Sequence, residues 1–168
     1  MTIRLATAAD LPELATLFRE TVLAHAPHYY SPAQTQAWAT AADDPQRLSA
    51  LILNVTTYVV EDDTGILGFA GLGEDGYVAS AYVRYDRLHQ GIGSRLMEIV
   101  LAAAKQQGMT RLHSEASEFS LGLFQKFGFR LYDTEIVERS GVRFKRYLVE
   151  KTGITVPDGS NSAPADWR

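Results

Sequence analysis

The sequence predicts an α/β fold in which helices flank a mixed, mostly antiparallel sheet. Apolar residues recur at helical spacing in the first third of the chain. From residue 57 onward, runs of strand-forming residues alternate with turn signals, as in a β-meander. A strand, a loop with Gly91 and Gly93, a long helix and another strand then follow. This last order implies a parallel strand pair with a right-handed crossover.

The individual elements are predicted from these patterns and from their caps. A short strand over residues 3–6 precedes a helix that begins after Thr7 or Asp10. Ser31 caps a second helix that runs to about residue 41, and residues 43–45 start a third. The later elements are strands at 57–61, 66–72, 77–84, 110–116 and 128–132, a helix from 92 to 108, a loop and short helix over 117–127, and a hairpin of 135–139 with 142–150.

Length and composition limit the classes of function. The 168 residues suit one domain, which we place at residues 1–151, followed by a tail at 152–168 that is loosely ordered or lies on the surface. A net charge of −4 argues against a nucleic-acid binder. The absence of cysteine excludes disulfides, thiol nucleophiles and cysteine metal sites, and no third ligand accompanies the pair His25 and His28. We expect no metal, no membrane partner, no signal peptide and a cytoplasmic location.

The loop with Gly91 and Gly93 is the first candidate functional feature. A helix start presents free backbone N–H groups and the positive end of the helix dipole to an anion. Glycine at these two positions lets a phosphate approach the backbone. The alternative is a strand–helix turn that uses glycine only for its geometry.

Several motifs in order resemble the GNAT N-acetyltransferase superfamily. They are the segment Gln90–Leu96 (QGIGSRL) and the segment Leu123–Phe129 (LFQKFGF), which looks like the superfamily's helix ending in Tyr-Glu-Lys-x-Gly-Phe. Residues 30–34 with Trp38, residues 114–117 and residues 137–142 resemble a bacterial subgroup of small GNAT proteins. The resemblance covers roughly residues 2–151.

The resemblance implies acetyl-CoA as donor and a primary amine as acceptor. It also implies a sheet that splays between its two central parallel strands, with the pantetheine arm in the cleft and the pyrophosphate on the glycine loop. A backbone N–H near Tyr82 or Val83 would polarise the thioester carbonyl. The donor-binding residues that the resemblance implies are Ala81, Tyr82, Val83, Leu88, His89, Gln90, Gly91, Ile92, Gly93, Ser94 and Phe124.

The chain departs from the family pattern at three positions. Leu88 stands where the family has glutamine or arginine, and Ala79 stands where the subgroup often has an acidic residue. Phe124 occupies the position of a tyrosine that protonates the leaving thiolate in many members. Another group or water performs that step here, or the thiolate leaves without a dedicated acid.

Glu115 and Ser117 are the predicted catalytic residues. Alternation places His113 and Glu115 on one face of their strand, which flanks the implied cleft. Glu115 is the first candidate general base and His113, also assigned to the acceptor side, is the second. The alternatives are a solvated, ion-paired Glu115 and a structural His113. Ser117 stands where many GNAT proteins have an asparagine near the pantetheine, or it caps the helix that follows.

Tyr29, Tyr30 and Trp38 are the predicted acceptor-binding residues. They lie between the first two helices, a region that lines the acceptor pocket in GNAT proteins. Their rings suit a cation or an apolar group. Trp38 and Tyr30 have a structural alternative, which is to dock the second helix on the sheet.

Two other classes of function compete with an acetyltransferase. Phe124 favours a CoA-binding regulatory module without turnover. A dinucleotide-binding protein fits less well, because Leu96 stands where the third glycine of that fingerprint belongs. A P-loop is excluded, because no Gly-Lys-Ser/Thr follows the glycines. The C-terminal hairpin and tail offer a contact for a homodimer.

Overall fold

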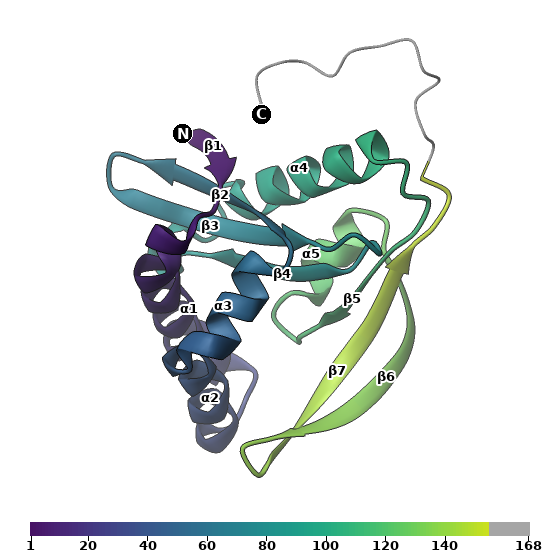
Figure 1. Cartoon of the computed structure of the whole chain (residues 1–168). Coiled ribbons are helices and arrows are strands. Elements are labelled where there is room, and N and C mark those ends of the chain that lie inside the picture. The colour runs from purple at the N-terminus through teal and green to yellow at the C-terminus, as the bar shows by residue number, and fades with distance from the viewer. Residues whose placement is uncertain (155–168) are drawn as a thin grey trace.

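The computed structural model describes residues 1–154 and has the predicted mixed α/β architecture (Figure 1). The elements follow in the order β1 (Thr2–Leu5), α1 (Leu11–His25), α2 (Pro32–Ala39), α3 (Pro45–Leu53), β2 (Thr56–Asp62), β3 (Gly65–Leu72), β4 (Val78–Val83), α4 (Ile92–Gln106), β5 (Leu112–Ala116), α5 (Leu121–Lys126), β6 (Arg130–Arg139) and β7 (Val142–Lys151). Most predicted elements are therefore confirmed to within a few residues.

The strands form two antiparallel groups that meet along one edge. The first has the order β1-β2-β3-β4 and the second the order β5-β7-β6. Between β4 and β5 there is a single parallel bridge, from Tyr77 to His113. The expected parallel pairing thus exists only at the start of the two strands, and beyond it they part, as the resemblance implied. Strand β5 pairs with β7, so the backbone of β5 forms its inter-strand hydrogen bonds with β7 and not with β4.

A few contacts hold β4 and β5 together below the point where they part. The His113 N–H donates to the Gly76 carbonyl at 3.0 Å, and the Ser114 hydroxyl donates to the Val78 carbonyl at 2.7 Å. Gly76 has a φ of 85°, and a Cβ there would lie 2.3 Å from the Arg111 carbonyl oxygen. Only glycine fits such a close approach of two backbones in this conformation.

Helices cover both faces of the first sheet (Figure 1). Helix α4 packs on one face, and α1, α2 and α3 pack on the other. Neighbouring residues of β2 enter opposite layers, with Val60 in the cluster under α4 and Val59 in the cluster under α1. This is the alternation of side chains along a strand. Strand β3 is buried along almost its whole length, so it forms the centre of the sheet.

The caps predicted from the sequence are present at α2 and α3. Ser31 and Gln34 form a reciprocal capping box, with bonds of 2.9 and 3.1 Å. The Asp44 carboxylate accepts from the N–H groups of Gln46 and Arg47. Helix α2 ends at Ala39, two residues earlier than predicted, because a 3-10 turn over Thr40–Asp43 follows it.

The C-terminal half differs from the prediction at one strand. The predicted separate strands at 128–132 and 135–139 are one continuous strand, β6, with an irregularity between Leu131 and Asp133. Pairing with β7 along its whole length overrides the local turn preference of Asp133 and Thr134. Ile154 is buried in the cluster under α4, and the predicted tail lies outside the described residues from 155 onward. No helix within residues 1–154 has the length and apolar character needed to cross a membrane.

A salt bridge fixes the chain where β1 leads into α1. The Arg4 guanidinium donates two bonds of 2.8 Å to the Asp10 carboxylate, and the Thr7 N–H donates a third, also of 2.8 Å. The Asp10 side chain is only 11% exposed. The hydrogen bonds from Arg4 lower the pKa of Asp10 to about 2. The ionised form is therefore the form that stabilises this corner of the fold.

Replacing this carboxylate, as in Asp10→Asn, should lower the free energy of unfolding at pH 7 by about 1–2 kcal/mol, discounted for the exposure of Arg4. Because the folded pKa is depressed, the difference from wild type should be full above about pH 4 and shrink as the pH falls toward 2. Urea unfolding at pH 7 and pH 3 measures it. Asp63→Asn, in an exposed turn, is the control. If the free energies of unfolding of wild type and Asp10→Asn differed by the same amount at pH 7 and pH 3, the low pKa of Asp10 would be contradicted.

Candidate active site

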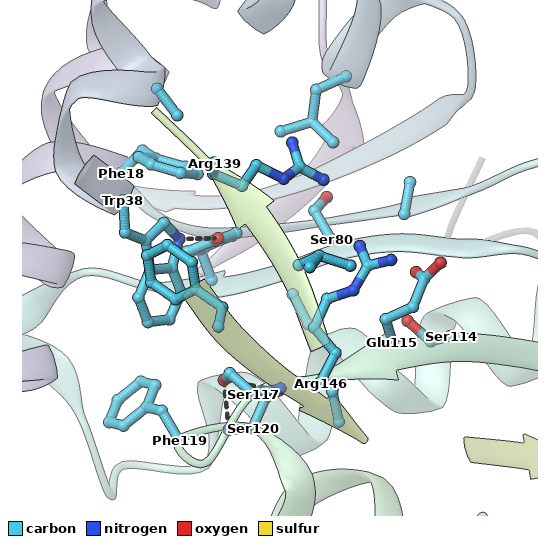
Figure 2. A pocket seen from close by; sticks show the side chains of 18 of the residues that line it. Phe18, Trp38, Ser80, Ser114, Glu115, Ser117, Phe119, Ser120, Arg139 and Arg146 are labelled. Carbon is cyan, nitrogen blue, oxygen red and sulfur yellow. Dashed lines mark hydrogen bonds between the residues drawn. The ribbon is translucent and has the colours of Figure 1, made fainter. Parts of the chain in front are cut away.

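A pocket of about 450 Å³ opens where β4 and β5 part. Strands β4 and β5 form its floor, α1, α2 and α3 form one wall, and the β6–β7 hairpin forms the other (Figure 2). The Gln34 side chain of α2 donates to the Arg143 carbonyl of β7 at 2.9 Å, so the two walls are joined. Of the predicted acceptor and catalytic residues, four line the pocket: Tyr30, Trp38, Glu115 and Ser117.

Glu115 lies on β5 and accepts a hydrogen bond from the Tyr77 hydroxyl. Burial and the neighbouring carboxylate raise the pKa of Tyr77, so its phenol stays protonated and donates. Sequence reasoning missed Tyr77, because 38 residues separate it from Glu115 and only the single parallel bridge brings them together. The carboxylate is thus fixed in orientation and lines the pocket, which suits an acceptor of protons.

The aromatic residues of the pocket form a layered wall. Trp38 donates from Nε1 to the Tyr82 hydroxyl at 3.1 Å, and burial raises the pKa of Tyr82 to about 12. The Tyr82 ring lies between Phe18 and Phe69, with ring centroids 4.7 and 5.3 Å away. Tyr30 contacts Trp38 edge-on and accepts from the Glu118 N–H at 2.8 Å. Tyr30 and Trp38 therefore both shape the pocket and pack the helices around it.

Two predicted acceptor residues lie elsewhere. The Tyr29 ring is exposed and contacts Phe119, and Tyr29 does not line the pocket. His113 lies against the Tyr77 ring, with its Nε2 3.7 Å from Asp75, and it does not line the pocket either. Although His113 and Glu115 share a strand face, only Glu115 reaches the pocket.

Ser117 and Ser120 bind each other at the start of α5. The Ser117 N–H donates to the Ser120 hydroxyl and the Ser120 N–H donates to the Ser117 hydroxyl, both at 3.0 Å. Both residues line the pocket, and the N-cap of α5 is Ser120, so Ser117 holds the turn before the helix and does not itself cap it. Phe124, also in the lining, is 3% exposed and packs edge-on against Phe129 with centroids 5.0 Å apart.

The edge of β4 beyond the bridge is open toward β5. The Arg84 N–H donates to the Leu67 carbonyl of β3 at 2.7 Å. Because backbone groups alternate between the two edges of a strand, the N–H of Tyr82 also faces β3, whereas those of Ala81 and Val83 face the opening. The Thr21 hydroxyl accordingly reaches the Val83 carbonyl from α1 at 3.0 Å. Within residues 1–154 the N–H groups of Ala81 and Val83 therefore have no partner strand, whereas the N–H of Tyr82 faces β3.

The loop before α4 has left-handed backbone at two positions and leads into the unpaired N–H groups of the helix start. His89 and Gly91 both have left-handed backbone, with φ of 60° and 82°, and Gly91 is the N-cap of α4. The first intrahelical bond runs from Arg95 to the Gly91 carbonyl, so the N–H groups of Ile92, Gly93 and Ser94 are the unpaired donors of the helix start. A Cβ on Gly91 would meet no atom within 4 Å, so the space before the helix is open. Leu88 and Gln90 complete this loop.

Lys126 places a positive charge beside this helix start. Its ammonium donates to the Ser94 hydroxyl at 2.8 Å. The nearby Arg87 and Arg95 side chains instead approach carboxylates, at 3.9 Å from Asp62 and 3.6 Å from Glu98. Lys126 could not be found from the sequence, because it comes from α5, 32 residues further along the chain. An anion at this site would contact backbone N–H groups and one ammonium.

The combined geometry is an open strand edge that leads from a pocket with a carboxylate to an anion-binding helix start. It accommodates an extended ligand with a reactive end and a phosphate-bearing end. In residues 1–154, no three His, Cys, Asp or Glu side chains come together as a metal site would require.

Comparison with known proteins identifies the family. A family model described as an acetyltransferase (GNAT) domain matches residues 26–151. The chain therefore belongs to the GNAT acetyltransferase family. Among curated proteins, none matches the chain significantly.

Solved structures of this family share the fold. A GCN5-related N-acetyltransferase from Rhodopseudomonas palustris has a TM-score of 0.85 at 24% identity, over 90% of this chain and 94% of that chain. The PaiA N-acetyltransferase of Thermoplasma acidophilum, in complex with coenzyme A, has a TM-score of 0.73 at 18% identity, over 90% and 99%. YncA of Salmonella typhimurium, with its cofactor acetyl-CoA, has a TM-score of 0.63 at 19% identity, over 98% of both chains.

Proposed function

We propose that this protein transfers the acetyl group of acetyl-CoA to a primary amine by direct attack of the amine. The observation that carries the proposal is the open edge of β4, which connects the helix start at Gly91 with the pocket around Glu115. Acetyl-CoA supplies an activated acetyl group on a thioester, and its pyrophosphate suits the N–H groups of residues 89–94 and Lys126. The family membership and the CoA complexes among structural neighbours support the same donor.

The open edge of β4 would also stabilise the charge that develops during transfer. The N–H groups of Ala81 and Val83 face the opening, and a donor fixed in a strand needs no reorganisation to bind a developing oxyanion. The Val83 carbonyl is held by Thr21, so this part of the strand cannot easily rotate. Val83 is therefore the residue whose N–H we assign to the thioester carbonyl.

Glu115 would act as the general base. An alkylammonium has a pKa near ~10, so a proton must leave before the nitrogen can attack. Glu115 takes this first proton, directly or through water, and passes it to solvent. As the new C–N bond forms and the C–S bond breaks, the nitrogen loses a second proton, which the same carboxylate accepts. Tyr77 also lines the pocket, and we assign it as a positioning residue because its hydroxyl donates to Glu115 and fixes the orientation of that carboxylate.

Phe124 supplies no proton to the departing thiolate. Its ring is buried against Phe129, and its role is to pack α5 beside the pocket. A thiol has a pKa of about 8.5, far below that of the amine, so a thiolate leaves readily and takes its proton from water. The cytoplasmic location, the homodimer and the acceptor roles of Tyr29 and His113 stay predictions from the sequence.

If Glu115 is the general base, Glu115→Gln should lose turnover but keep its affinity for acetyl-CoA. We expect kcat to fall by about 10²–10⁴-fold, the usual contribution of a general base. The Kd for acetyl-CoA should stay near the wild-type value, because Glu115 lies away from the loop at Gly91. Thiol release against pooled primary amines and calorimetry measure the two quantities. Glu138→Gln, an exposed carboxylate on β6, is the matched control. Unchanged turnover in Glu115→Gln would remove this residue from the mechanism.

A second prediction concerns the donor site alone. Lys126→Met keeps the alkyl stem and removes the charge beside Ser94. The Kd for CoA should rise by about three- to tenfold at low salt, and less at high salt, as for a partly exposed charge contact. Lys105→Met, at the other end of α4, should leave the Kd unchanged. Equal affinities of wild type and Lys126→Met at low salt would place the pyrophosphate elsewhere.

A further inference from the structure

The pocket has the opposite charge from the rest of the chain. The chain has a net charge of −4, yet only one carboxylate, Glu115, lines the pocket. The cationic residues in the lining are Arg47, Arg139, Lys145 and Arg146. These four come from α3 and the β6–β7 hairpin, so their meeting in one cavity is a property of the fold and not of a basic segment in the sequence.

Arg139 and Arg146 present unmet donors to the cavity. Figure 2 shows both guanidinium groups turned toward the part of the pocket where Ser80 and Glu115 lie. Arg146 pairs with Glu135 through Nη2, but its buried Nε has no hydrogen-bond partner within residues 1–154. Arg139 is exposed to solvent and forms no salt bridge in the same part of the chain, so its charge is available to a ligand at the cavity. Both charges are close enough to act on the Tyr77 hydroxyl, whose pKa they lower against the stronger effect of burial.

Ser80 adds a neutral donor to this group. Its side chain is 7% exposed and lines the pocket, and its hydroxyl has no hydrogen-bond partner among the described residues. Unpaired buried donors are costly, so the Arg146 Nε and the Ser80 hydroxyl together point to a ligand that accepts hydrogen bonds. A carboxylate accepts at two oxygens and suits the planar guanidinium of arginine.

Aromatic rings also make up a large part of the pocket lining. Besides Tyr30 and Trp38, the rings of Phe18, Phe119 and Phe144 line it. Phe144 contacts Tyr30, with centroids 6.2 Å apart, so the aromatic wall continues from α2 onto the β6–β7 hairpin. An apolar or aromatic body is what such a surface binds.

The cationic groups also select against polyamines. A second ammonium would meet like charges at Arg139 and Arg146, which disfavour it. The same field lowers the pKa of a single bound ammonium and raises the share of neutral amine that can attack. An acceptor with one amine and one carboxylate therefore has two advantages. Its carboxylate is attracted by the arginines, and its single ammonium is more easily deprotonated.

We propose that the acceptor is an amine that also carries a carboxylate and an apolar body, of the size of an aromatic amino acid. Arg139 and Arg146, assisted by Ser80, bind its carboxylate, and the ring wall binds its side chain. This inference rests on the proposed acetyltransferase function and names the substrate class of the same site.

Matched amines test the assignment. L-Phenylalanine and 2-phenylethylamine differ only in the carboxylate, and spermidine represents polyamines. For the wild type we expect kcat/KM for L-phenylalanine to exceed that for 2-phenylethylamine by about tenfold to a hundredfold, the range of a charge-assisted contact. In Arg139→Gln this ratio should fall about tenfold. Arg143→Gln, an exposed arginine on the same hairpin outside the lining, should keep the wild-type ratio. Preference for either amine without a carboxylate, or an unchanged ratio in Arg139→Gln, would overturn the inference.

A binding measurement separates this inference from the function on which it rests. Calorimetry in the presence of CoA compares N-acetyl-L-phenylalanine with its uncharged amide. Binding of the acid at least tenfold tighter, lost in Arg139→Gln and kept in Arg143→Gln, supports the carboxylate site even if the donor chemistry is different. If thiol release is absent with every amine, the acetyltransferase proposal fails. If neutral amines are acetylated and the acid binds no better than the amide, only the carboxylate assignment fails.

Discussion

The parting of β4 and β5 is the constraint on which the rest of the structure depends. One parallel bridge, one main-chain bond to Gly76 and the Ser114 hydroxyl hold the two strands at their start. Beyond that point β5 takes β7 as its partner, and the edge of β4 is left with free N–H groups in the centre of the molecule. Unpaired strand edges are normally avoided inside a protein, so this one marks a place for an extended ligand.

The opening between β4 and β5 has two ends, the helix start near Gly91 and the pocket around Glu115, and different kinds of group line them. Backbone groups dominate at the helix start near Gly91, where any sequence with the right glycines and turn geometry would suffice. Side chains dominate in the pocket, where Glu115 is oriented by Tyr77 and cations face aromatic rings. One cleft can therefore combine a donor site built from backbone groups with an acceptor site built from side chains.

Local patterns made much of the fold predictable from the sequence. The capping box at Ser31, the helix ends and the strands of the meander depend on neighbours a few residues apart. The glycine loop was predictable for the same reason. The pairs Tyr77–Glu115 and Lys126–Ser94 were not, because each joins segments more than thirty residues apart through the tertiary fold. A signal for the hairpin did exist: period-2 alternation places Val137 and Arg139 on one face with Phe144 and Arg146.

The bond between Gln34 and the Arg143 carbonyl has a consequence for how such a protein diversifies. It fastens the outer hairpin to α2 by a main-chain acceptor, which every residue type at position 143 would provide. The hairpin can thus change most of its side chains while keeping its place above the cleft. Since it contributes nothing to the helix start near Gly91, new acceptors become accessible by mutation in a peripheral segment while donor recognition is inherited intact.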